Sequence, residues 1–74
     1  MGRPTRVTNA IRVHRARCDM TQAELAERIG VTRQTVIAVE QGRYSPSLEM
    51  AFQIARALGV ALDDVFAYPD EEHP

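Results

Sequence analysis

The feature that most constrains this chain is residues 22–41, which read QAELAERIGVTRQTVIAVEQ. Gly30 divides the stretch at a point where a tight turn needs φ > 0, a conformation that glycine adopts without strain. Ala26 supplies the small side chain that two steeply crossing helices need where their axes approach. The apolar residues that would lock the two helices together are Leu25, Ile29, Val31, Val36 and Val39. This pattern predicts a pair of short helices joined by a turn.

Capping signals predict where these and the other helices begin. Thr21 and Glu24 have the spacing of a capping box, and Thr32 precedes the second helix of the pair. Asn9 and Ser47 are suitable N-caps for two further helices, whereas Ala61 is a poor cap for a last turn. The expected helices cover residues 10–17, 22–28, 33–41, 48–58 and 62–66.

Length and cysteine content limit the class of protein. The 74 residues are expected to form one domain, with residues 9–66 as its core and residues 1–5 and 70–74 disordered. Cys18 is the only cysteine, so neither an internal disulfide nor a cysteine-based zinc site is expected. No run approaches the ~20 apolar residues of a membrane span. We therefore expect a cytoplasmic protein that has no metal, no cofactor and no membrane contact.

Charge is distributed unevenly along the chain. Residues 1–43 contain eight arginines and four acidic residues, whereas residues 44–74 contain one arginine and six acidic residues. All nine cations are arginines, whose forked guanidinium suits phosphate and guanine. The first half could therefore face nucleic acid although the net charge is −1. Ordinary surface charge would give the same asymmetry, and genomic base composition the same arginine usage.

Two residues of the first helix could suggest chemistry. Ile11, His14 and Cys18 share one face at helical spacing, so we interpret His14 as a half-buried histidine and Cys18 as a packing residue. No nucleophile–base pair, metal constellation or phosphate-binding glycine loop occurs, and an enzyme is therefore not expected. The aromatic residues form no stacking platform, which disfavours single-stranded RNA.

Three runs resemble the Xre/Cro/C1-type helix-turn-helix family: MTQAELA (20–26), GVTRQTV (30–36) and EQGRYSPSL (40–48). The likeness covers about residues 9–66 and is strongest to compact, stand-alone bacterial repressors. It implies an all-α, five-helix lambda-repressor-like DNA-binding domain. In some compact members the termini form a short two-stranded antiparallel sheet, for which residues 6–8 and 66–68 are the candidates.

The resemblance also implies which residues bind double-stranded DNA. Gln22, at the start of the second helix, would bind a phosphate, although it could instead be a polar first-turn residue. Arg33 and Gln34 would open the helix in the major groove, where arginine pairs with guanine and glutamine with adenine. The remaining expected contacts come from Thr32, Thr35, Ile37, Ala38, Arg43 and Tyr44.

These remaining residues would have different roles. Thr35 would bind phosphate, and Arg43 and Tyr44 would grip the DNA backbone. Ile37 and Ala38 suit thymine methyl groups, but Ile37 could instead lie in a surface for a partner protein. Arg15 and Glu40 match positions that form a structural ion pair in some family members. The sequence departs from the family pattern at three positions. Gly is common in the family where this chain has Asp19, a Leu-like residue is common at His14, and Ser or Thr is common at Ala61.

The leading hypothesis is a homodimeric repressor that reads a pseudo-palindromic operator, because one such module contacts few bases. The candidate dimer seam consists of Phe52, Leu62, Val65, Phe66 and Tyr68. The alternative is the antitoxin of a toxin–antitoxin pair, which would bind both an operator and a partner protein.

Overall fold

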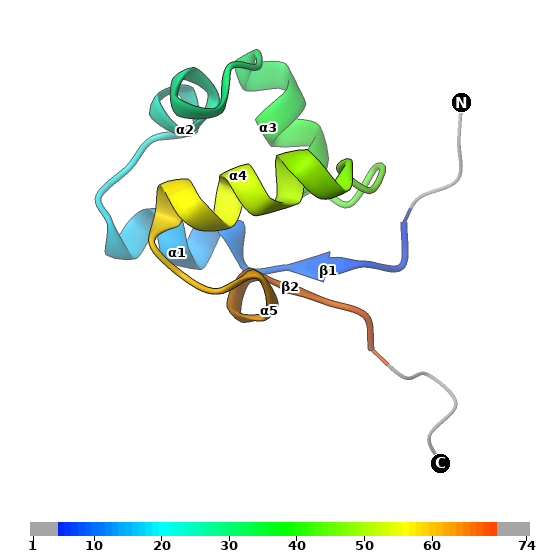
Figure 1. The fold of residues 1–74 in the computed structure, drawn as a ribbon. Coiled ribbons are helices and arrows are strands. Elements are labelled where there is room, and N and C mark those ends of the chain that lie inside the picture. Colours follow the sequence, from blue (N-terminus) through cyan, green and yellow to red (C-terminus); the bar gives the residue numbers. More distant parts are fainter. Residues whose placement is uncertain (1–4, 70–74) are drawn as a thin grey trace.

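The computed structural model describes residues 5–69, in which five helices enclose an apolar core and two short strands pair side by side (Figure 1). The expected all-α, five-helix fold and its terminal sheet are therefore confirmed. The elements in chain order are β1 (Thr8–Asn9), α1 (Ile11–Arg17), α2 (Gln22–Ile29), α3 (Arg33–Glu40), α4 (Leu48–Leu58), α5 (Leu62–Val65) and β2 (Phe66–Ala67).

Side-chain caps explain why α2 and α4 begin where they do. The Thr21 hydroxyl accepts a hydrogen bond from the Glu24 N–H at 3.0 Å, and the Glu24 carboxylate accepts one from the Thr21 N–H at 2.8 Å. This capping box satisfies N–H groups that have no partner inside the helix. The Ser47 hydroxyl likewise accepts from the Met50 N–H at 3.0 Å at the start of α4.

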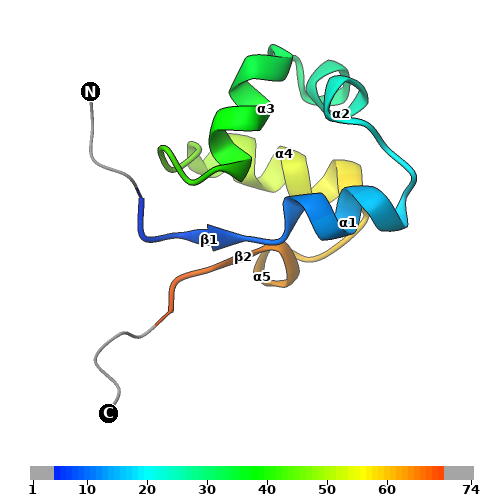
Figure 2. The ribbon, with the colours of Figure 1, turned by 180° about the vertical axis from the view of Figure 1, so that it is seen from behind.

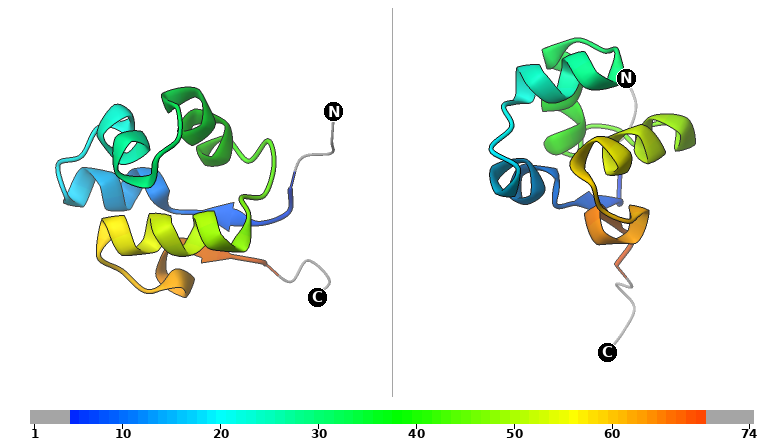
Figure 3. Two further views of the ribbon diagram at one scale, coloured as in Figure 1. Left: turned by 45° about the horizontal axis from the view of Figure 1, so that its top comes forward. Right: turned by 60° about the vertical axis from the view of Figure 1, so that its left-hand side comes forward.

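The core is built from one face of each helix. The largest side chains that are fully buried come from four helices: Ile11 of α1, Leu25 of α2, Ile54 of α4 and Val65 of α5. From α3, Val36 and Val39 face the same core. Figure 3 shows α4 lying across the other helices, with α2 and α3 together on one side of it and α5 on the other. The apolar stripe of α3 is thus buried in the core, and the opposite face of this helix remains available for contact with another molecule.

The terminal elements differ from the prediction by one or two residues. The antiparallel register pairs Thr8 with Ala67 and Asn9 with Phe66, so β1 starts later than residues 6–8. Phe66 has the extended conformation φ −123°, ψ 145°, and α5 therefore ends at Val65. These boundaries depend on pairing between the two strands. A strand of two residues is too short for its own sequence pattern to predict that pairing.

Several local expectations can be compared directly with the structure. Asp19, where Gly is common in the family, takes the left-handed conformation after the end of the first helix, with φ 57°. His14 is half-buried as predicted, with Nε2 3.1 Å from the Asp64 carbonyl oxygen. The interpretation of Cys18 as a packing residue is wrong: α1 ends before it, and its side chain is exposed.

The expected disorder of residues 1–5 and 70–74 falls outside the described residues except at Thr5. The Thr5 N–H donates to the Gly42 carbonyl at 3.3 Å, and its hydroxyl lies 2.6 Å from that of Ser45. The start of the described chain therefore contacts the loop that follows α3.

Candidate nucleic-acid interface

The turn between α2 and α3 has the geometry that its residues predicted. Gly30 ends α2 with φ 75°, and the Val31 N–H donates to the Ala26 carbonyl at 3.0 Å. The Thr32 hydroxyl then accepts from the Thr35 N–H at 3.2 Å and so caps α3. Ala26 is buried at 3% exposure, where α2 packs closely on its neighbours. The α2–α3 pair is thus a rigid unit defined by a glycine turn and two threonine caps.

The first turn of α3 presents polar side chains to solvent. Arg33 and Gln34 are exposed, and within residues 5–69 neither side chain has a hydrogen-bond or ion-pair partner. The Thr35 hydroxyl is half-buried and lies 3.1 Å from the Thr32 hydroxyl. Ile37 and Ala38, one turn later, are also half-buried. Arg33 and Gln34 are therefore the two side chains of this turn that are free to bind a partner.

An ion pair ties α1 to the last residue of α3. Arg15 Nε donates to Glu40 Oε2 at 2.7 Å, and Arg15 Nη2 donates to Glu40 Oε1 at 3.3 Å. The side chains are only 13% and 10% exposed, and Arg15 Nη1 also donates to the Met20 carbonyl at 3.0 Å. The pairing suggested by the resemblance is present, with forked geometry that fixes the direction of both side chains.

Gln22 joins this ion pair from α2. Its Nε2 donates to Glu40 Oε1 at 3.1 Å, and the side chain is half-buried. The Glu40 carboxylate thus accepts from α1 and α2 while it belongs to α3. A second N–H of the Gln22 amide remains for another acceptor, since an amide nitrogen carries two.

The loop after α3 carries the other two expected contacts. Arg43 is exposed, and Tyr44 is 39% exposed. The Arg43 N–H donates to the Ala38 carbonyl at 3.1 Å, which folds the loop back onto α3. Both residues therefore follow the end of α3 with side chains that are open to solvent.

A groove opens between α1, α2 and α3. Seen from behind, α1 lies below α2 and α3, while α4 lies further back (Figure 2). The groove has a volume of about 980 Å³ and includes Gln22, Arg33 and Ile37 among the predicted DNA-binding residues. It brings together the start of α2 and the exposed face of α3, as the predicted interface requires.

Asn9 has a structural role at this interface that the sequence did not reveal. Its Nδ2 donates to the Val39 carbonyl at 3.0 Å and to the Glu40 carbonyl at 3.4 Å, which lie at the end of α3. Its Oδ1 accepts from the Ile11 N–H at 3.1 Å at the start of α1. The N-cap position of α1 is Ala10, one residue after the expected Asn9. Because the Val39 and Glu40 carbonyls are about 30 residues from Asn9, no local pattern could indicate those two contacts.

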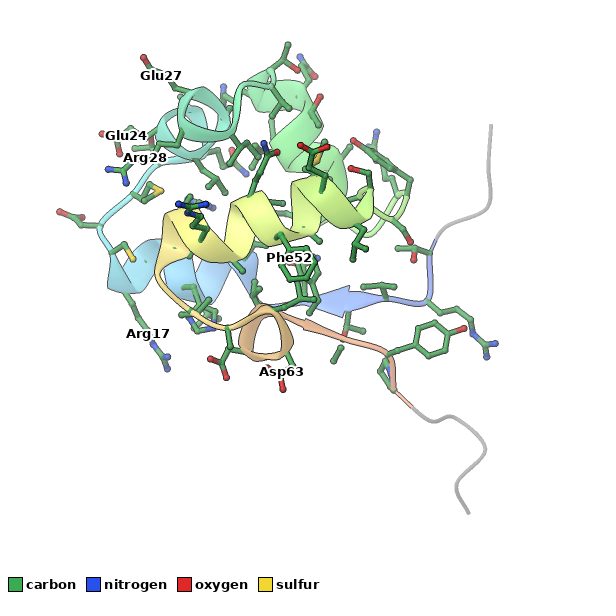
Figure 4. All side chains as sticks on the ribbon, viewed as in Figure 1. Arg17, Glu24, Glu27, Arg28, Phe52 and Asp63 are labelled. Atoms are coloured by element: carbon green, nitrogen blue, oxygen red, sulfur yellow. The ribbon has the colours of Figure 1, made fainter. Side chains whose placement is uncertain are left out.

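The candidate dimer seam needs one correction. Val65 is only 2% exposed and packs in the core of the single chain, so it cannot form a surface seam. Phe52 and Tyr68 are 53% and 67% exposed, while Leu62 and Phe66 are half-buried against the core. Phe52 projects outward from α4 (Figure 4). Leu48, which the prediction omitted, is 69% exposed one turn before Phe52 on the same helix.

Neither a metal-binding cluster nor a membrane-spanning helix occurs in the part of the chain that the structure describes. Among the described residues, no group of three or more His, Cys, Asp or Glu side chains could hold a metal ion. No helix within residues 5–69 is long and apolar enough to cross a lipid bilayer.

Taken together, the glycine turn, the two threonine caps and the exposed first turn of α3 define a helix-turn-helix unit of the kind that binds DNA. The chain belongs to the helix-turn-helix family of the Xre/Cro/C1 type, and the family profile described as "Helix-turn-helix" matches residues 11–65. The match runs from the first residue of α1 to the last residue of α5 and so covers all five helices. The family resemblance suggested by the three sequence runs is therefore confirmed.

Small regulators of two organisms resemble the chain over most of its length. A protein of Methanothermobacter thermautotrophicus is 58% identical over 62 residues, which are 82% of this chain and 90% of that protein. One of Methanocaldococcus jannaschii is 48% identical over 64 residues, 86% of this chain and 97% of that protein. Each is described as an HTH-type transcriptional regulator.

Two further proteins have more specific descriptions. The cryptic phage CTXphi transcriptional repressor RstR of Vibrio cholerae is 36% identical over 58 residues, 78% of this chain and 52% of RstR. The crystal structure of the restriction-modification controller protein C.AhdI of Aeromonas hydrophila superimposes with a TM-score of 0.68 at 30% identity, covering 73% of this chain and 78% of that one.

Proposed function

We propose that the protein is a transcriptional regulator that binds double-stranded DNA sequence-specifically, with α3 in the major groove. The observation that carries this proposal is the exposed first turn of α3. Arg33 and Gln34 are exposed on a helix whose buried residues, Val36 and Val39, are fixed in the core. A rigid helix with free hydrogen-bonding side chains at its N-terminal end is what reading of base edges requires.

The other predicted residues would position this helix. Gln22, through the N–H that Glu40 leaves available, and Arg43, from the loop after α3, would bind backbone phosphates. Thr32, Thr35 and Tyr44 would add polar contacts, and Ile37 and Ala38 would meet thymine methyl groups. In this arrangement the phosphate contacts fix the position of α3 along the DNA, and Arg33 and Gln34 determine which base sequence is bound.

The proposed regulator acts as a homodimeric repressor in the cytoplasm. One module reads few base pairs, so two copies on half-sites about one helical turn apart would supply the specificity. The exposed side chains of Phe52 and Tyr68, with Leu62 and Phe66 beside them, are the proposed seam. The repressor role is supported by the likeness to RstR. The antitoxin alternative gains no support from the relatives described above, whose descriptions concern transcription and control.

The proposal is tested by measuring binding of the purified protein to the DNA upstream of its own gene and to a scrambled duplex of the same length. The measurement is repeated across a salt series, because contacts to phosphates make affinity salt-dependent. We expect the upstream duplex to bind at least about a thousandfold more tightly, as specific sites do relative to non-specific ones. Equal affinity for the two duplexes at every salt concentration would refute sequence-specific recognition.

A further inference from the structure

The groove between α1, α2 and α3 contains a positive side chain that none of the roles above uses. Arg12, on α1, lines this groove together with Arg33 of α3 and Gln22 of α2. Arg12 is exposed and, within the described residues, has no hydrogen-bond or ion-pair partner. Its position on a third helix extends the predicted interface beyond the α2–α3 pair.

The charges in the groove are not equivalent. Arg15 and Glu40 line it too, but they are bonded to each other at 2.7 Å and so largely neutralise one another. Arg12 of α1 and Arg33 of α3 form no ion pair within residues 5–69. The remaining acidic residue, Asp19, lies beyond the end of α1. An anion that enters between α1 and α3 would therefore meet two free guanidinium groups.

We propose that Arg12 binds a phosphate of the DNA backbone, so that α1 contacts DNA as well as α2 and α3. This inference rests on the proposed DNA-binding function and names a contact that the α2–α3 unit does not contain. The reason for a phosphate is the placement of Arg12. It shares the groove with Gln22, at the helix start where a phosphate is expected, and it does not lie on the helix that enters the major groove. A free guanidinium in that position binds a phosphate by forked hydrogen bonds.

The chain provides a matched control on the same helix. Arg17 is also exposed, and it has no partner among the described residues. It lines a separate hollow with His14, Cys18 and Leu58. In Figure 4 it projects from α1 on the side away from α2 and α3. Arg12→Gln and Arg17→Gln thus make the same change in net charge on opposite sides of α1.

The experiment compares the salt dependence of DNA affinity for the native protein, Arg12→Gln, Arg17→Gln and Arg12→Lys. Each phosphate contact contributes a slope of about −0.9 to the plot of log affinity against log salt concentration. Because the proposed dimer carries two copies of Arg12, we expect Arg12→Gln to make the slope shallower by about 1.8, or about 0.9 for each protomer. The ratio of affinities for the upstream and scrambled duplexes should stay unchanged, because a phosphate carries no base identity. Arg12→Lys should keep the native slope, and so should Arg17→Gln.

The outcomes separate this inference from the proposed function. If the native protein binds DNA and Arg12→Gln has the same slope as Arg17→Gln, the phosphate contact is refuted while the proposed function stands. If Arg12→Gln changes the ratio between the two duplexes, Arg12 reads bases and the assignment is wrong. If the native protein binds neither duplex, both proposals fail. Thermal unfolding of each variant, expected to match the native protein, distinguishes loss of contact from loss of folding.

Discussion

Replacing Glu40 with leucine should destabilise the protein more than any change at its exposed charges. The carboxylate accepts hydrogen bonds from Arg15 Nε at 2.7 Å, Arg15 Nη2 at 3.3 Å and Gln22 Nε2 at 3.1 Å. With Glu40 10% exposed and Arg15 13% exposed, its removal strands a guanidinium that water reaches poorly. Breaking a buried pair in this way costs about 3–5 kcal/mol.

We expect a value near the lower end of that range, because Arg15 keeps its bond to the Met20 carbonyl. The expected loss is about 3 kcal/mol in the free energy of unfolding. For a domain of this size each kcal/mol lowers Tm by roughly 4–8 °C, so Tm should fall by about 12 °C or more. Urea unfolding with an unchanged m-value would show that the folded state itself is destabilised.

A double-mutant cycle tests the cause of this loss. Arg15→Met removes the charge that Glu40→Leu strands, so the double variant should recover about 2 kcal/mol relative to the sum of the single changes. If each single change costs less than about 1 kcal/mol and the two add, the pair behaves as an exposed salt bridge. The stabilising role assigned to the ion pair between α1 and α3 would then be wrong.

Three further changes test other parts of the structure. Asn9→Ala should cost about 1–2 kcal/mol in unfolding free energy, because the carbonyls of Val39 and Glu40 lose their donor; an unchanged urea midpoint would contradict this. Gly30→Ala should cost about 1–2 kcal/mol from the strain of φ 75° alone, since a Cβ there meets nothing within 4 Å; a stabilised variant would show that the turn can rearrange. Phe52→Glu should shift the native protein from dimer to monomer in sedimentation without lowering Tm of the monomer, and a dimer of undiminished affinity would exclude α4 from the seam.

The fold was predictable because its signals are local. The capping box at Thr21, the turn at Gly30 and the cap at Ser47 act over three or four residues, and each occurs where the sequence places it. The apolar stripes then determine which faces meet. Shifts of one residue occurred where a boundary depends on a distant partner, as in the pairing of Asn9 with Phe66.

The site was only partly predictable for the same reason. The exposure of Arg33 and Gln34 follows from their position in the first turn of α3, outside its apolar stripe. In contrast, Val65 has the apolar character of a seam residue, and its burial becomes evident only when α5 packs against α4. The groove position of Arg12 likewise depends on how α1 lies against α3. Residue type and spacing identified the reading helix, whereas tertiary packing decided what surrounds it.

The most direct test of the central proposal compares Arg33→Ala with Arg43→Ala on the upstream and scrambled duplexes. Arg33 would read a base from the first turn of α3. Its loss from both protomers of the proposed dimer should reduce the discrimination between the duplexes by about 2–6 kcal/mol, about 1–3 kcal/mol for each half-site. Arg43 would bind the backbone, so its loss should weaken binding to both duplexes by the same factor. If Arg33→Ala, still folded, also weakens both duplexes equally, α3 does not read the sequence through this residue and the account is contradicted.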